Sequence, residues 1–289
     1  MFLSSDLNKA YVNFLLHILP VFEHFNVTLQ CKSPKIHILR QLMNELFKTL
    51  LSKFMLPNVV KSSKSFLEVN FYSRDNQKDD VDLVVGQTTN KIVESLSDKE
   101  KKSFYAHIRK YFVKVCDYMR QKFPFNDEVV INAEFANMEN FDKASFSSVK
   151  FFIDRFPGLL KSLGDCSTVD ELQSQFNSLQ LEDFLGSLES EQRIDSKWDK
   201  LCAMFKNKYD LLSKFMLSIL AIPHINSECE RIFSLVTKAH TQFRSSMTAK
   251  NLENLMTVKP KYSEPCFKQK FDDDFLKRAK SATVNKFAS

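Results

Sequence analysis

Three side chains within seven residues, His224, Cys229 and Glu230, are of types that could do chemistry. A cysteine beside an imidazole at the start of a helix has a lowered pKa and can act as a nucleophile. Pro223 and the turn into the helix leave the geometry of this pair open, and a buried structural cysteine is the commoner arrangement. We therefore favour a structural cysteine and expect no nucleophilic enzyme.

Glu230 also has a structural interpretation. It stands three residues after Ser227, which is the spacing of a capping box. In that motif the glutamate carboxylate accepts a hydrogen bond from the serine amide and offsets the positive end of the helix dipole. Arg231 and Arg244 could contact DNA phosphates, but pairing with nearby glutamates is at least as favourable. We assign no DNA-binding residue.

The other histidines and cysteines form no cluster with ligand spacing. Four histidines fall on predicted helices without the spacing of metal ligands: His17, His24, His37 and His107. Six cysteines are dispersed without a CxxC pair: Cys31, Cys116, Cys166, Cys202, Cys229 and Cys266. This spacing fits neither a zinc finger nor a disulfide framework. Reduced thiols are expected, with no metal, cofactor or small-molecule substrate.

Composition favours a mainly α protein with a real core. The chain has 289 residues, 44% of them apolar, and 4 glycines against 28 phenylalanines, so a glycine-rich phosphate loop is excluded. No apolar run is long enough to cross a membrane and the N-terminus shows no secretory leader, so an intracellular protein without a membrane partner is expected. The net charge of +6 favours weak attraction to nucleic acid.

Helical spacing of apolar residues defines two elements near the N-terminus. Asp6 is predicted to cap the first helix, in which Pro20 predicts a kink. Ser33 and Pro34 begin the second helix, which ends at Pro57. Each helix has one apolar face, so the two are expected to form an antiparallel hairpin.

The next segment combines irregular chain with a long helix. Residues 73–82 are polar and predict an exposed loop, preceded by a short strand at residues 66–71. Ser97 with Glu100 forms a capping box that begins a helix running to about Lys122. For residues 129–131, strand and helix both remain open, because the run is short.

Further helices are predicted in the second half. One spans residues 145–156, and a second follows a capping box made by Thr168 and Glu171. A polar, acidic connector is expected at residues 180–196. From Trp198, apolar residues then keep helical spacing as far as Ile222.

Two more helices and a basic tail are predicted at the C-terminus. The helix starting at Ser227 is expected to bury Ile232, Phe233, Val236 and His240. A last helix from about Thr248 is expected to bury Leu252, Leu255 and Met256, and the tail is expected to be partly ordered.

The C-terminal part also resembles a known family. Ile222-Pro223, the string SECERIFS at residues 227–234 and FRSS at residues 243–246 closely resemble the C-terminal signature of hAT superfamily transposases and of host proteins derived from them. Phe22-Glu23-His24, residues 33–37, Phe156-Pro157 and the Trp198 region resemble, less specifically, the helical insertion of domesticated BED-type members.

The resemblance implies an incomplete transposase. In the family, an RNase H-like core carries three acidic residues that bind divalent metal for DNA cleavage and transfer, with a helical insertion before the last acid. The chain looks like that insertion plus the C-terminal helices of the core, and Glu230 matches the last acid by position. The resemblance assigns no residue of this chain to the two strand-borne aspartates or to the zinc-binding BED finger. One glutamate cannot hold two metal ions, so no catalytic residue is assigned and the chain is expected not to be an enzyme.

The resemblance also divides the chain and predicts a partner. Residues 1–165 correspond to the insertion, 166–197 to a connector, 198–262 to the dimerisation region and 263–289 to a basic, partly disordered tail. The region carries more apolar surface than two short helices can bury on each other, so a homodimer is expected. The predicted dimerisation residues are Phe233, Val236, Phe243, Leu252, Leu255 and Met256.

Three functions follow from these expectations. The first is a non-enzymatic, truncated or domesticated hAT protein that dimerises. The second is a module that binds nucleic acid weakly through its basic residues, with an affinity that falls steeply with salt. The third is the C-terminal fragment of an active transposase. Nuclear location is implied by the resemblance alone, and the composition otherwise fits a cytoplasmic protein.

Overall fold

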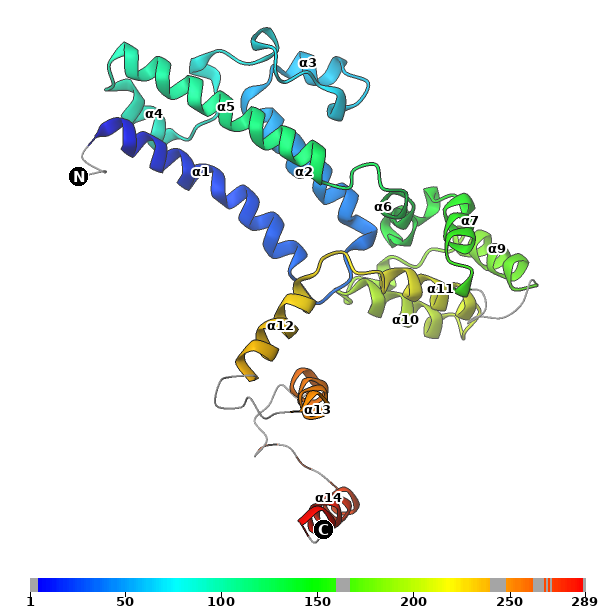
Figure 1. Cartoon of the computed structure of the whole chain (residues 1–289). Helices are drawn as coiled ribbons and strands as arrows, with labels where there is room; N and C mark the ends of the chain where they lie inside the picture. The colour runs from blue at the N-terminus through cyan, green and yellow to red at the C-terminus, as the bar shows by residue number, and fades with distance from the viewer. Residues whose placement is uncertain are drawn as a thin grey trace. The chain divides into compact units, whose positions relative to one another are not determined.

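The computed structural model describes residues 5–159, 167–239, 248–261, 268, 270 and 272–287 (Figure 1). The chain divides into two units, Met1–Ile225 and Asn226–Ser289. Within the described ranges every regular element is a helix, apart from an isolated bridge between Met55 and Gln77. The mainly α prediction is confirmed, whereas the assignment of the C-terminal helices to an RNase H-like core stays a prediction.

The first unit contains these α-helices: α1 (Asp6–Leu29), α2 (Ile36–Phe54), α3 (Pro57–Ser62), α4 (Gln87–Glu94), α5 (Asp98–Lys122), α6 (Glu128–Asn132), α7 (Phe146–Arg155), α9 (Ser167–Leu179), α10 (Ile194–Met204) and α11 (Asp210–Leu220). Short 3₁₀ turns connect them: η2 (Phe66–Glu68), η3 (Arg74–Asn76), η4 (Asp80–Asp82), η5 (Ala133–Ala136), η6 (Met138–Lys143) and η7 (Gly186–Leu188). Residues 129–131, left open above, therefore belong to a helix.

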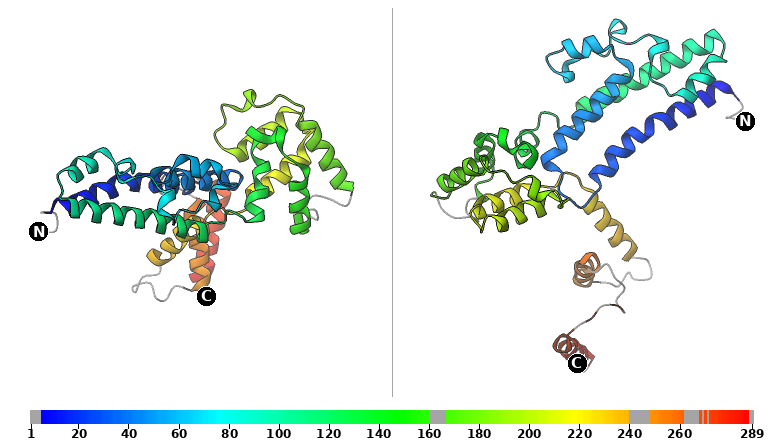
Figure 2. Two further views of the ribbon diagram at one scale, coloured as in Figure 1. Left: turned by 90° about the horizontal axis from the view of Figure 1, so that it is seen from above. Right: turned by 180° about the vertical axis from the view of Figure 1, so that it is seen from behind.

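The long helices α1, α2 and α5 lie side by side, with α4 against α1 (Figures 1 and 2). Helices α1 and α2 run antiparallel, as predicted, and α1 continues through Pro20. Aromatic side chains fill the space between the helices: Phe14 meets Phe112 edge-on at 5.7 Å, and Phe54 stacks on Phe112 at 5.2 Å between ring centroids. Offset and edge-on ring pairs of this kind add stability beyond their buried area.

Of the two capping boxes predicted in the first unit, one forms and the other does not. At the start of α5, the Glu100 amide donates to Ser97 Oγ at 3.4 Å and the Ser97 amide donates to the Glu100 carboxylate at 3.0 Å, which confirms that prediction. The prediction for Thr168 is wrong. Helix α9 already begins at Ser167, so Thr168 lies inside the first turn, where its side chain is buried.

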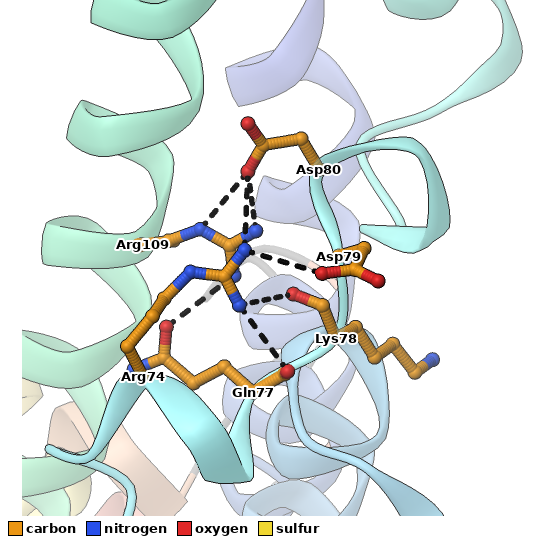
Figure 3. A network of polar contacts seen from close by, with 6 residues as sticks. All are labelled: Arg74, Gln77, Lys78, Asp79, Asp80 and Arg109. Carbon is orange, nitrogen blue, oxygen red and sulfur yellow. Dashed lines mark hydrogen bonds and ion pairs between the residues drawn. The ribbon is translucent and has the colours of Figure 1, made fainter.

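The segment before α4 also departs from expectation. No strand forms at residues 66–71, because the backbone bonds there are local: the amide of Glu68 donates to the carbonyl of Ser65 and that of Phe71 to Val69, each at 3.0 Å. The following loop is held in place (Figure 3). The buried guanidinium of Arg109 on α5 donates from Nε to Asp80 at 3.2 Å and from Nη1 to Gln77 at 3.3 Å.

A second group of helices, α6, α7, α9, α10 and α11, packs with η5 and η6 around aromatic side chains. Trp198 is fully buried, and its Nε1 donates to the carbonyl of Ala136 at 3.1 Å. Phe141 packs against Trp198 at 5.6 Å and against Phe176 at 4.9 Å between centroids. Contacts between α2 and η5 join this group to the long helices.

The predicted helix from Trp198 to Ile222 is divided in two. Lys206 and Asn207 have φ angles of 50° and 63°, and the amide of Asn207 donates to the carbonyl of Cys202 at 2.9 Å. A left-handed residue ends an α-helix in this way, and asparagine is one of the few types that adopts it readily. The preceding connector is also more ordered than its polarity predicts, because Phe184 and Leu188 in it are buried.

The second unit contains α12 (Ser227–Ala239), α13 (Ala249–Lys261) and α14 (Asp273–Phe287). Helices α12 and α13 contact each other. Helix α14 falls in the basic tail, for which partial order was expected. In the part of the chain that the structure describes, no helix is both long and apolar enough to cross a membrane.

Candidate self-association surface

Helices α12 and α13 carry the residues predicted to mediate dimerisation. The amide of Glu230 donates to the carbonyl of Asn226 at 3.0 Å, so Asn226 directly precedes the first turn of α12. Thr248 caps α13, because its Oγ1 accepts a hydrogen bond from the amide of Asn251 at 3.3 Å. The prediction that a helix follows Thr248 is confirmed.

The apolar side chains of these helices remain partly accessible. Phe233 is 67% exposed, so the prediction that α12 buries it within one chain is wrong. The side chains of Val236, Leu252, Leu255 and Met256 are of intermediate exposure, as are Ile232 and Leu235. Phe243 and His240 lie outside the described residues. The structure thus brings five of the six predicted residues onto two contacting helices.

None of the described side chains of the second unit is buried. This arrangement is costly, because apolar surface left in water forgoes the largest favourable contribution to folding. A contiguous exposed apolar surface on a folded protein commonly marks an interaction site. We call Ile232, Phe233, Leu235 and Val236 of α12, with Leu252, Leu255 and Met256 of α13, the apolar surface of α12 and α13.

Sequence reasoning missed Leu235. It lies three residues after Ile232 and precedes Val236, so helical spacing could have included it.

Two of the residues considered for catalysis, Glu230 and His224, lie among the described side chains. The side chain of Glu230 is exposed, and the described residues include no group of three or more histidine, cysteine, aspartate or glutamate side chains that could hold a metal ion. The side chain of Ser227, its predicted capping partner, lies outside the described side chains.

Of the predicted pair of His224 and Cys229, the structure describes the side chain of His224. Nε2 of His224 lies 3.0 Å from the carbonyl oxygen of Leu29, a hydrogen bond that gives the imidazole a structural partner. The Cys229 side chain lies outside the described side chains. Elsewhere, burial raises the pKa of the Cys116 thiol to about 12, which keeps it protonated and unreactive near neutral pH.

Comparison with known families identifies the C-terminal region. Residues 172–262 match the family model of the hAT family C-terminal dimerisation region. These residues are therefore similar to the dimerisation region of hAT family proteins. The resemblance drawn from the strings at residues 222–246 is thereby confirmed. No curated protein and no solved structure matched the chain.

The matched region, residues 172–262, includes elements of both units. It covers most of α9, together with α10 and α11, whose side chains form part of the aromatic core around Trp198. It then covers α12 and α13 with their apolar surface. The family match supports self-association of the chain, while the likeness of the first half to the family's insertion stays a prediction.

Proposed function

We propose that this chain is a non-enzymatic protein derived from a hAT transposase and that two copies associate through the apolar surface of α12 and α13. The observation that carries the proposal is the 67% exposure of Phe233 in a unit with no buried side chain among those described. The family match at residues 172–262 supports the same conclusion independently.

The physical argument is that a second copy supplies the missing partner. Burying one phenylalanine side chain stabilises by about 2 kcal/mol. In a two-fold symmetric dimer each residue contributes twice, so Phe233 would contribute about 4 kcal/mol to association. That free energy corresponds to a change of about a thousandfold in the dissociation constant.

Sedimentation equilibrium on the purified chain tests this part of the proposal. The unmodified protein is expected to be dimeric at micromolar concentration, and Phe233→Asp and Leu252→Asp are each expected to shift it to monomer. The matched control is Leu16→Asp on α1, where the leucine is 63% exposed, and it should leave the dimer intact. A protein that is monomeric throughout would contradict the proposal.

The non-enzymatic part of the proposal is supported by the sequence, in which Glu230 is the one acid that matches the family's catalytic positions. Purified protein is expected neither to cleave nor to join duplex DNA in the presence of Mg²⁺ or Mn²⁺. Cleavage that Glu230→Gln abolishes would overturn this part and would make the chain a portion of an active transposase.

A further inference from the structure

We propose that the groove between α1 and α5 binds an acidic amphipathic helix of a partner protein. The groove has a volume of about 650 Å³ and lies in the first unit, apart from the surface through which two copies are proposed to associate. Leu46 of α2 and Met119 of α5 line it and are buried, so its floor is apolar. Its aromatic lining residues are Phe22, Phe25, Tyr111, Tyr118 and Phe123.

The walls of the groove are two helices that run in the same direction (Figure 1). The hydroxyl of Tyr11 on α1 lies 2.7 Å from Nδ1 of His107 on α5. Fourteen residues further along α1, Phe25 stacks on Phe123 at the end of α5, at 5.7 Å between ring centroids. The two walls therefore stay in register along the groove and form a straight trough.

The apolar surface of the groove extends along α1. Leu19 and Leu15 precede the lining residue Phe22 by three and seven positions, so all three share one face of the helix. Leu19 is 53% exposed and Leu15 is 42% exposed, and Tyr118 on the opposite wall is 62% exposed. From Leu15 to Asn26 the helix rises about 17 Å, or three turns. An apolar trough of this length accepts a third helix, whose apolar side chains at i, i+4 and i+7 pack between those of the walls.

The charge of α5 indicates which kind of helix the groove accepts. Helix α5 contains eight Lys and Arg against three Asp and Glu, which is most of the net charge of +6 of the chain. Its described ion pairs are made by its two arginines, Arg109 with Asp80 and Arg120 with Asp117. Asp117, the carboxylate that lines the groove, also accepts a hydrogen bond from the hydroxyl of Tyr72. That acid is therefore already paired, whereas the lysines of α5 leave an excess of positive charge.

Three of these lysines follow the edge of the groove. Lys114 lines it, Lys110 lies one turn before Lys114, and Lys122 lies one turn after Tyr118. All three are exposed. Between residues 15 and 26, α1 carries one charged carboxylate, that of Glu23, and no lysine or arginine. The positive charge is thus confined to the α5 side. A bound helix with acidic residues along the edge that faces α5 complements it, and this complementarity favours an acidic partner over a basic one.

Fluorescence polarisation with two labelled synthetic peptides tests the proposal on the full chain. Both peptides are helices of about 16 residues with leucines at i, i+4, i+7 and i+11, and they differ only in their flanking residues, glutamate in one and lysine in the other. We expect saturable binding of the acidic peptide and none of the basic one. Leu19→Asp and Tyr118→Asp change exposed side chains and should each weaken binding about tenfold or more, with circular dichroism to verify the fold.

A charge reversal separates recognition from a structural effect. Lys114→Glu should weaken binding of the acidic peptide about tenfold and should allow the basic peptide to bind. Lys61→Glu makes the same change on an exposed position of α3 and should leave binding of both peptides unchanged. Phe233→Asp, which alters the second unit, should also leave peptide binding unchanged, so the groove and the proposed dimer are tested separately.

Other occupants of the groove give different results. If Leu19→Asp converts a dimer to a monomer in sedimentation equilibrium, a second copy of the chain covers the groove and the proposal is overturned. It is also overturned if a single-stranded oligothymidine binds more tightly than the acidic peptide and Lys114→Glu abolishes that binding, because the groove then serves nucleic acid. Absence of saturable binding of the acidic peptide, or equal binding of the two peptides, overturns it as well.

Discussion

The two units differ in the burial of their phenylalanine side chains. Phe141 in the first unit is 1% exposed and contacts two other aromatic rings, whereas Phe233 in the second is 67% exposed. Phe141 belongs to the 3₁₀ turn η6, and Phe233 to helix α12. The difference lies in the helices that cover them, because the first unit packs several helices together, whereas in the described part of the second unit α12 contacts α13 without burying a side chain.

An amphipathic pattern predicts which face of a helix is apolar, but it does not predict what covers that face. In the first unit the partner is another helix of the same chain. In the second, we propose that the partner is another copy of the chain, on the basis of the family match and the exposure. If the units differ in this way, a variant in one unit should leave the other unchanged.

The largest effect is expected from Phe141→Ala. Removing this buried ring leaves a cavity against Phe176 and Trp198, and changes of this type cost about 4 kcal/mol. Urea denaturation followed by circular dichroism should show a correspondingly lower free energy of unfolding for the first unit. Phe233→Ala is the matched variant of the second unit and should leave the unfolding transition of the first unit unchanged. If both variants lowered the free energy of unfolding of the first unit equally, the two phenylalanines would not differ in their contribution to its stability.

The next effect concerns pH. The pKa of His37 falls from 6.5 to about 4 on folding, so between these values the unfolded chain binds a proton that the folded chain does not. The free energy of unfolding of the first unit should therefore decrease, by up to about 3 kcal/mol, as the pH is lowered from 6.5 to 4. Urea midpoints across this range measure the decrease. His37→Asn should flatten it, and a variant that keeps the full pH dependence would show that other groups cause it.

A smaller effect is expected from Gly86→Ala. Gly86 precedes α4 with a φ of 97°, and an added Cβ would lie 2.9 Å from Cγ of His17 on α1. The strained backbone alone costs about 2 kcal/mol for a residue other than glycine. Thermal denaturation should show a lower midpoint. Gly158→Ala is the control, because an added Cβ there meets nothing within 4 Å.

The smallest effect is expected from the helix caps. Ser97→Ala removes a cap of α5 and should lower the free energy of unfolding of the first unit by about 1 kcal/mol. Thr248→Ala removes the corresponding cap of α13 in the second unit. It should reduce helix content there without moving the main transition. A shift of that transition by Thr248→Ala would show that the two units unfold together.

Local signals predicted the helices of the first unit well where both ends were marked. The Ser97 cap and the spaced apolar residues after it located α5, because capping and amphipathic spacing depend on residues three or four apart. The break before Tyr209 was missed, since apolar spacing continues through it and a left-handed Asn207 leaves little trace in that pattern.

Features that depend on distant residues could not be predicted. Nothing near residues 73–82 indicates that Arg109, 29 residues after Asp80, holds this loop. The unpaired nitrogen of His37 depends on packing between α2 and segments about a hundred residues or more away. The dimerisation residues were predicted mainly because the resemblance identified the region, and the structure adds that their side chains remain accessible within one chain.

The position of Trp198 gives the molecule a built-in optical reporter. It is the only tryptophan of the chain and lies fully buried beside Phe141 in the first unit. Intrinsic fluorescence excited at the red edge of protein absorption therefore comes from the first unit alone. A red shift of its emission follows unfolding of that unit, while the second unit contributes no tryptophan signal.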